Sequence, residues 1–287
     1  MKPGALTYIR AASVQHAVDQ LVEGGMDAKV LAGGQSLMPM LNLRMVSAER
    51  IVDIGSIPEL KTWSADDREV RIGACVTHEQ IQQGQVQDPS NGLMPKVASA
   101  IAYQAVRNRG TIGGSLALAD PSADWLTTTA ALRATIEWLG PDGPGSCLAE
   151  DFVLAAYTTR LEMSDLITGV RIPRLDPAAR WGTYKLCRKT GEFAHAMAMV
   201  IRAPNQSRAF LGATDGAPIR LPHTERVLAT LKEWQASHGA VLSDAMDSDL
   251  AESGRELTDI QIWQSHTCLR RSVRLSFGFQ DVELESL

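Results

Sequence analysis

The chain has 287 residues, of which 45% are hydrophobic and 21% charged, and its formal net charge is -5. This composition is typical of a globular protein with room for two or three domains, and it argues against a disordered chain. The acidic balance argues against a broad electrostatic surface for nucleic acid, and no apolar run approaches the length that spans a bilayer. Because the first residues contain no apolar signal segment, we expect a cytoplasmic protein.

The opening of the chain is typical of a small α/β unit. Ser13 is a candidate N-cap, and apolar residues at helical spacing follow it as far as the glycines at 24–25. The short apolar run at 29–31 predicts a buried strand that ends in the glycine loop 32–36. Residues 50–54 predict a second strand, and the segment 55–58 is a candidate boundary.

The middle of the chain alternates predicted strands and helices. Thr77, with Gln80 three residues later, predicts a capping box after a strand at 70–74. Residues 94–106 are apolar and rich in alanine, and they predict one packed helix that leads into a second glycine loop at 109–116.

Asp120, which precedes Pro121, is the candidate N-cap of a further helix. Residues 135–139 and 166–172 predict later strands.

The pattern changes near residue 181. Three runs typical of strands follow one another at 181–188, 195–202 and 207–213, and helices are predicted after them, for example at 224–234 and 260–277. Consecutive strands followed by helices predict a separate α+β domain.

Two glycine loops offer the clearest chemical signal. Consecutive backbone N–H groups at such loops form an anion-binding nest, and absent side chains let a ligand approach the backbone closely. The Rossmann and Walker A patterns are both missing, so any bound phosphate lies outside those folds. The K-T-G triplet at 189–191 has no S-x-x-K partner, which rules out the corresponding hydrolase.

The spacing of cysteines and histidines gives no sign of a metal site. The cysteines Cys75, Cys147, Cys187 and Cys268 form no C-x-x-C pair, and the six histidines form no H-x-x-x-H or H-E-x-x-H pattern. We therefore expect no metal ion and no iron–sulfur cluster in this chain.

Three segments carry a resemblance to a known family: AGGQSLMP at 32–39, VRNRGTIGGSL at 106–116 and ADPSAD at 119–124. Their order and spacing resemble the medium, FAD-binding subunit of molybdenum hydroxylases, whose relatives include the carbon monoxide dehydrogenase medium subunit and the flavin domain of xanthine dehydrogenase. The resemblance covers essentially the whole chain. It implies an α+β protein with a vanillyl-alcohol-oxidase (PCMH)-type FAD-binding fold of two α/β subdomains, at 1–55 and 56–175. A C-terminal α+β domain, a three-stranded sheet with helices, would follow at 176–287.

The resemblance also implies which residues hold FAD. The first loop would wrap the pyrophosphate with its N–H groups and the Ser36 hydroxyl, and the second loop would hold the other side. Asp124 would accept hydrogen bonds from polyol or sugar hydroxyls, and Lys185 would lie beside the pyrimidine edge of the flavin. The complete expected set is Lys29, Ala32, Gly33, Gly34, Gln35, Ser36, Leu37, Ile101, Ala102, Thr111, Gly114, Ser115, Asp124, Ile167 and Lys185.

The function implied by the resemblance is electron transfer within a complex. A large subunit would carry the molybdopterin cofactor and hydroxylate the substrate, and a small subunit would carry 2Fe-2S clusters. FAD in this chain would pass the electrons to an external acceptor, and the assembly would be a dimer of heterotrimers. No side chain is expected to act as a catalytic acid, base or nucleophile. The substrate stays open among N-heteroaromatic compounds, aldehydes, purines and carbon monoxide.

Two departures from the family pattern and two rival functions stay open. Leu118 stands where many relatives have histidine, and Phe193 stands where some have tyrosine, so the flavin potential or oxidant access could differ. The first rival is a stand-alone flavin oxidase, which needs a base beside the flavin that the sequence does not show. The second is a non-enzymatic binding or scaffold subunit, which the intact glycine loops disfavour.

Overall fold

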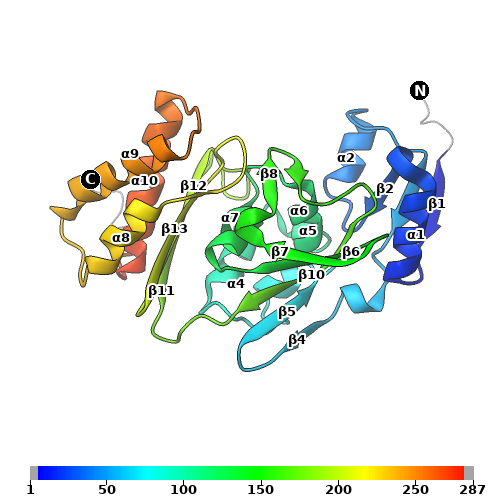
Figure 1. Ribbon diagram of the computed structural model, residues 1–287, viewed down its shortest axis with the longest axis horizontal. Helices are drawn as coiled ribbons and strands as arrows, with labels where there is room; N and C mark the ends of the chain where they lie inside the picture. The colour runs from blue at the N-terminus through cyan, green and yellow to red at the C-terminus, as the bar shows by residue number, and fades with distance from the viewer. Residues whose placement is uncertain (1–5, 281–287) are drawn as a thin grey trace.

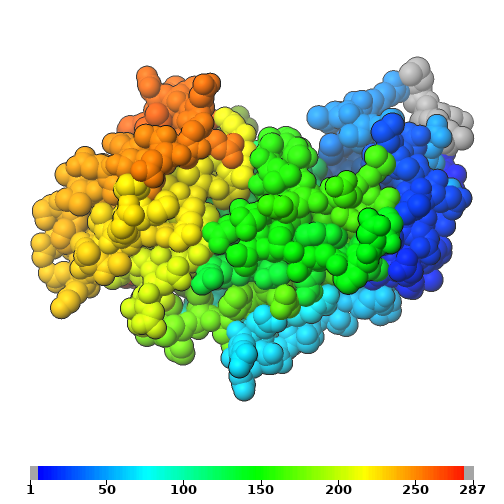
Figure 2. Space-filling model, viewed as in Figure 1, coloured from blue at the N-terminus to red at the C-terminus, as the bar shows by residue number. Residues whose placement is uncertain are grey.

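The computed structural model describes residues 6–280, which form three main sheets arranged along the long axis of the molecule and a small two-stranded sheet (Figure 1). Figure 2 shows an elongated body with the N-terminal unit at one end, the C-terminal domain at the other and the middle unit between them. Among the described residues, no helix is both long and apolar enough to cross a membrane.

The N-terminal unit is a parallel sheet of the order β1-β3-β2 with α1 packed against it. Its elements are β1 (Thr7–Arg10), α1 (Val14–Gly24), β2 (Ala28–Leu31), α2 (Leu37–Asn42) and β3 (Arg50–Asp53). The predicted cap is confirmed, because the Ser13 hydroxyl accepts a hydrogen bond from the His16 N–H at 3.1 Å. The helix ends at Gly25, whose φ is +52°.

The middle unit is an antiparallel sheet of the order β4-β5-β10-β6-β7 with short helices between its strands. The strands are β4 (Trp63–Ala65), β5 (Glu69–Gly73), β6 (Thr135–Gly140), β7 (Gly143–Leu148) and β10 (Leu166–Pro173), and β8 (Val153–Ala155) and β9 (Thr158–Thr159) form a separate hairpin. The helices are α3 (His78–Gln82), α4 (Leu93–Ser99), α5 (Gln104–Arg107), α6 (Ile112–Leu118) and α7 (Asp124–Ala131). The capping box of Thr77 and Gln80 is confirmed.

Two predictions in this unit were wrong. The single helix expected at 94–106 is divided into α4 and α5, because Ala102 adopts a left-handed backbone with φ of +43°. The N-cap expected at Asp120 lies instead at Ala123, and the Asp120 carboxylate accepts a hydrogen bond from the Ser122 N–H at 2.9 Å, closing a turn before α7.

The C-terminal domain is a sheet of the order β11-β12-β13-β14 covered by three helices. Its elements are β11 (Arg180–Leu186), β12 (Ala196–Ala203), β13 (Gln206–Gly212), β14 (Ile219–Arg220), α8 (Pro222–Thr230), α9 (His238–Glu252) and α10 (Asp259–Ser276). The three expected strands are present. The sheet also has a fourth, β14, whose two residues are too few to show periodicity in the sequence.

One apolar core runs through the first two sheets and reaches the third. On β12, Met199 and Ile201 join this core, whereas Ala198 and Val200 join a second core under the C-terminal helices. Alternating side chains of one strand therefore serve two cores. The three main sheets lie within residues 7–53, 63–173 and 180–220. We propose the domain boundaries 1–55, 56–175 and 176–287.

Candidate functional site

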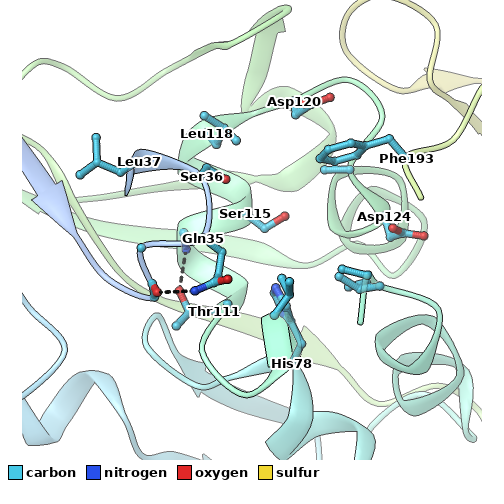
Figure 3. A pocket seen from close by; sticks show the side chains of 18 of the residues that line it. Gln35, Ser36, Leu37, His78, Thr111, Ser115, Leu118, Asp120, Asp124 and Phe193 are labelled. Atoms are coloured by element: carbon cyan, nitrogen blue, oxygen red, sulfur yellow. Dashed lines mark hydrogen bonds between the residues drawn. The ribbon is translucent and has the colours of Figure 1, made fainter. Parts of the chain in front are cut away.

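A cavity of about 1000 Å³ lies where the N-terminal unit, the helices of the middle unit and β11 meet. All residues of the expected set line it except Ile167. In Figure 3, Gln35, Ser36 and Thr111 lie on one side of the cavity and Asp124 and Phe193 on the other. Segments far apart in the sequence thus supply one site.

The first glycine loop follows β2 and packs directly against the second. A Cβ atom on Gly33 would lie 2.1 Å from the carbonyl oxygen of Arg109 and 2.9 Å from the Cα of Gly110. Gly34 adopts a φ of +74°, which glycine tolerates without a steric penalty. The Gln35 side-chain amide donates to the Gly33 carbonyl at 3.2 Å. Glycine is therefore required for the two loops to touch.

The second loop is attached to the end of β5. The Thr111 hydroxyl accepts a hydrogen bond from the Gly114 N–H at 3.1 Å, and the Gly113 N–H donates to the Ala74 carbonyl at 2.9 Å. A Cβ atom on Gly113 would lie 2.5 Å from that of Ala74, so this glycine lets the loop approach β5. Ser115 also lines the cavity.

An ion pair stands on the far wall. The Lys185 ammonium lies 2.9 Å from the Asp124 Oδ2, and their side chains are only 13% and 12% exposed. Burial raises the pKa of the Asp124 carboxyl above its usual range, and the adjacent Lys185 opposes this. Tyr184 and Leu186 pack against the second core on the other face of the sheet, as strand alternation predicts.

The remaining expected residues differ in how they reach the cavity. The Lys29 ammonium donates to the Met26 carbonyl at 2.9 Å. Ile101 and Ala102 line the cavity from the break between α4 and α5. Ile167 is 3% exposed on β10 and belongs to the apolar core. Its expected contact with a cofactor stays a prediction.

Several lining residues were not in the expected set. The segment after β11 contributes Arg188 and Glu192, which form an ion pair at 3.3 Å, and also Phe193 and His195. Phe193 is 62% exposed. The resemblance drew attention to Phe193, because some relatives have tyrosine there, whereas no spacing rule identifies the ion pair.

His78 is another lining residue outside the expected set. It begins α3, as its position after the capping residue indicates, but it is also 5% exposed on the cavity wall. The Trp125 indole N–H donates to its Nδ1 at 3.0 Å. Burial, assisted by the charge of Arg107, lowers the pKa of His78 to about 4. Nothing in the sequence links His78 to Trp125, which lies 47 residues away.

Metal-ligating side chains do not cluster in residues 6–280, where no group of three or more His, Cys, Asp or Glu residues could hold an ion. The four cysteines are free. Burial raises the pKa of Cys75 and of Cys268 to about 12, so both thiols stay protonated and unreactive.

The cavity fits a long anionic ligand. Both glycine loops line it, and the buried Lys185–Asp124 ion pair lies on the opposite wall. The volume of about 1000 Å³ is at the upper end of small-molecule sites. A dinucleotide has the size and charge that this arrangement accommodates.

Comparison with known proteins decides the family. Residues 4–175 match the model of a family described as "FAD binding domain in molybdopterin dehydrogenase". The chain belongs to this family. The carbon monoxide dehydrogenase medium chain of Hydrogenophaga pseudoflava is 36% identical over 224 residues, which cover 77% of this chain and 78% of that protein.

Solved structures extend the similarity to nearly the full chain. A chain of carbon monoxide dehydrogenase from Hydrogenophaga pseudoflava superposes with a TM-score of 0.86 at 30% identity and covers 96% of this chain and 98% of that one. Quinoline 2-oxidoreductase from Pseudomonas putida 86 gives a TM-score of 0.85 at 30% identity with the same coverage. The expected fold class is confirmed, and this FAD-binding medium chain is an oxidoreductase subunit.

Proposed function

We propose that this chain holds FAD in the cavity and passes electrons through it as the medium subunit of a molybdenum hydroxylase. The observation that supports this is the convergence of both glycine loops and the Lys185–Asp124 pair on one cavity of about 1000 Å³. When bound, FAD supplies the reversible acceptance of electrons, and the protein supplies orientation and electrostatics. The chain itself needs no catalytic acid, base or nucleophile.

Different residues of the cavity would bind different parts of FAD. The backbone N–H groups of residues 32–36 and the Ser36 hydroxyl would bind one side of the pyrophosphate. Thr111, Gly114 and Ser115 would bind its other side. Asp124 would accept hydrogen bonds from polyol or sugar hydroxyls. Lys185 would lie beside the pyrimidine edge of the flavin, where reduction deposits negative charge.

The proposed assembly supplies the chemistry that this chain lacks. A large subunit would carry the molybdopterin cofactor and the substrate pocket, and a small subunit would carry 2Fe-2S clusters. Two such heterotrimers would pair, and an external acceptor would take the electrons from FAD. The substrate would be chosen by the large subunit, which is consistent with relatives named for substrates as different as carbon monoxide and quinoline.

The absorption spectrum of the purified chain tests this proposal. Flavin bands at one FAD per chain, reduced by substrate only after the large and small subunits are added, support electron transfer. Turnover by the chain alone would favour the flavin oxidase instead. A purified chain that contains no flavin and cannot be reconstituted with FAD would favour the non-enzymatic scaffold subunit.

A further inference from the structure

His78 is a nearly buried polar side chain in direct contact with the second glycine loop. Its backbone N–H donates to the Gly110 carbonyl at 3.0 Å. A Cβ atom on Gly110 would lie 2.8 Å from the Nε2 of His78, so glycine lets the loop backbone pass over the edge of the imidazole. Gly110 and His78 both line the cavity.

Trp125 determines which ring nitrogen of His78 carries the proton. An indole N–H can only donate, and it donates to Nδ1 at 3.0 Å, so Nδ1 is the unprotonated nitrogen. Because burial keeps the pKa of His78 at about 4, the ring is neutral near pH 7 and its one proton is on Nε2. Trp125 is fully buried and follows Asp124 on α7, so this tautomer is firmly held.

The Nε2–H of His78 has no hydrogen-bond acceptor among residues 6–280, although the side chain is only 5% exposed. Nε2 is not among the fully enclosed side-chain atoms without a partner, so it is open to the cavity that His78 lines. Since His78 faces the cavity, a bound ligand can supply the missing acceptor. Figure 3 shows the imidazole between the Thr111 and Asp124 sides of the cavity.

We propose that His78 is a further ligand-binding residue, which donates its Nε2–H to a phosphate oxygen of the bound dinucleotide. This inference rests on the proposed function, because it requires FAD in the cavity. A phosphate is the acceptor because Nε2 lies beside Gly110, in the loop whose next residues would hold the pyrophosphate. A neutral donor there adds a hydrogen bond without adding a charge.

Two variants of similar side-chain length test the inference. His78→Gln keeps an N–H donor, and His78→Met does not. We expect FAD to bind apoprotein carrying His78→Gln within about threefold of wild type, and His78→Met at least about tenfold more weakly, which is the typical loss for a hydrogen bond to a charged group. His16→Met, on α1 outside the cavity lining, is the control and should bind FAD like wild type.

Spectroscopy identifies the acceptor. In the ³¹P spectrum of bound FAD, His78→Met should shift one phosphate resonance, and His78→Gln should leave both in place. Should His78→Met fail to fold, the ¹⁵N spectrum of the wild-type imidazole serves instead, because FAD binding should shift its Nε2–H resonance.

The outcomes separate this inference from the proposed function. Equal affinities of the glutamine and methionine variants, unchanged phosphate resonances or an unmoved Nε2–H resonance would overturn the inference alone. Wild-type apoprotein that does not bind FAD would overturn the proposed function with it.

Discussion

The Lys185 ammonium and the Asp124 carboxylate, which belong to β11 and α7, lie 2.9 Å apart inside the cavity. Each was expected to serve FAD separately, one beside the flavin ring and one on the polyol. Their pairing means that the lysine charge is partly neutralised by its neighbour before any cofactor binds. A Coulomb interaction at ~4 Å and an effective dielectric of about 20 amounts to ~4 kcal/mol, so neither charge acts alone.

The ion pair predicts opposite effects of two variants on the flavin potential. Lys185→Met removes the cation and should make the flavin harder to reduce. Asp124→Asn leaves the cation uncompensated and should make it easier to reduce. A net change of about 1.4 kcal/mol corresponds to about 30 mV for a two-electron couple, so shifts on the order of 30 mV are expected. The measurement is the midpoint potential at equal FAD occupancy.

Lys96→Met is the matched control for the ion-pair variants. Lys96 is an exposed residue of α4 that does not line the cavity. The flavin midpoint potential of this control variant should match that of wild type. If both ion-pair variants also match wild type, the flavin ring does not lie beside Lys185.

Substitutions in the two glycine loops are expected to differ in their effect on the stability of the fold. Gly33→Ala should abolish FAD retention and also destabilise the fold by about 1–3 kcal/mol, because its Cβ would overlap a backbone carbonyl at 2.1 Å. Gly114→Val should lose FAD with a smaller effect on stability. The nearest atom to a Cβ at Gly114 is the rotatable Thr111 hydroxyl at 2.9 Å. Flavin absorbance per chain and the thermal midpoint measure the two effects.

Gly239→Ala is the control for the glycine variants. No atom lies within 4 Å of a Cβ at this position, which is in α9. Alanine is preferred to glycine in a helix, so this variant should retain FAD and be as stable as wild type or slightly more stable. Full flavin content in both Gly33→Ala and Gly114→Val would show that these loops do not hold the cofactor.

His78 predicts a specific loss of stability in acid. Its folded-state pKa of about 4 is below the ordinary value of 6.5, so the unfolded chain takes up the proton first as the pH falls. The stabilisation is complete above about pH 6.5 and is lost progressively toward pH 4, by about 3 kcal/mol in total.

Denaturant unfolding of the apoprotein at pH 7.5 and pH 4.5 measures the effect of His78. The comparison is between wild type and His78→Gln, because other groups titrate equally in both. Wild type should lose about 2–3 kcal/mol more than the variant between the two pH values. Parallel losses in both proteins would mean that His78 is not held neutral by burial.

The proposed assembly predicts what accompanies the chain in its source. Native mass spectrometry of the purified complex should show this chain with one larger and one smaller partner, at twice the mass of a single heterotrimer. An electron carrier between proteins must present a docking face, so separation of the subunits should abolish substrate-dependent reduction of the flavin. A monomer or homodimer in the source extract contradicts this prediction and favours the oxidase.

Local signals in the sequence determined most elements and the family. The cap at Ser13, the capping box of Thr77 and Gln80, and the alternation of β11 depend on residues close together in the chain, so the sequence alone predicted them. The glycine loops were also predicted, because their motifs are contiguous. The helix break at Ala102 was missed, since alanine favours a helix and only tertiary packing imposes its left-handed backbone.

Only the tertiary structure decided which side chains meet. The resemblance implied that Lys185 and Asp124 bind FAD separately, whereas packing of α7 against β12 and β13 of the C-terminal sheet brings them together as an ion pair. The hydrogen bond from Trp125 to His78 joins residues that are 47 positions apart, and no pattern of residue types in the sequence predicts it. The physical reason is that burial and long-range contact set the charge and tautomer of these groups, and neither is a property of the local chain.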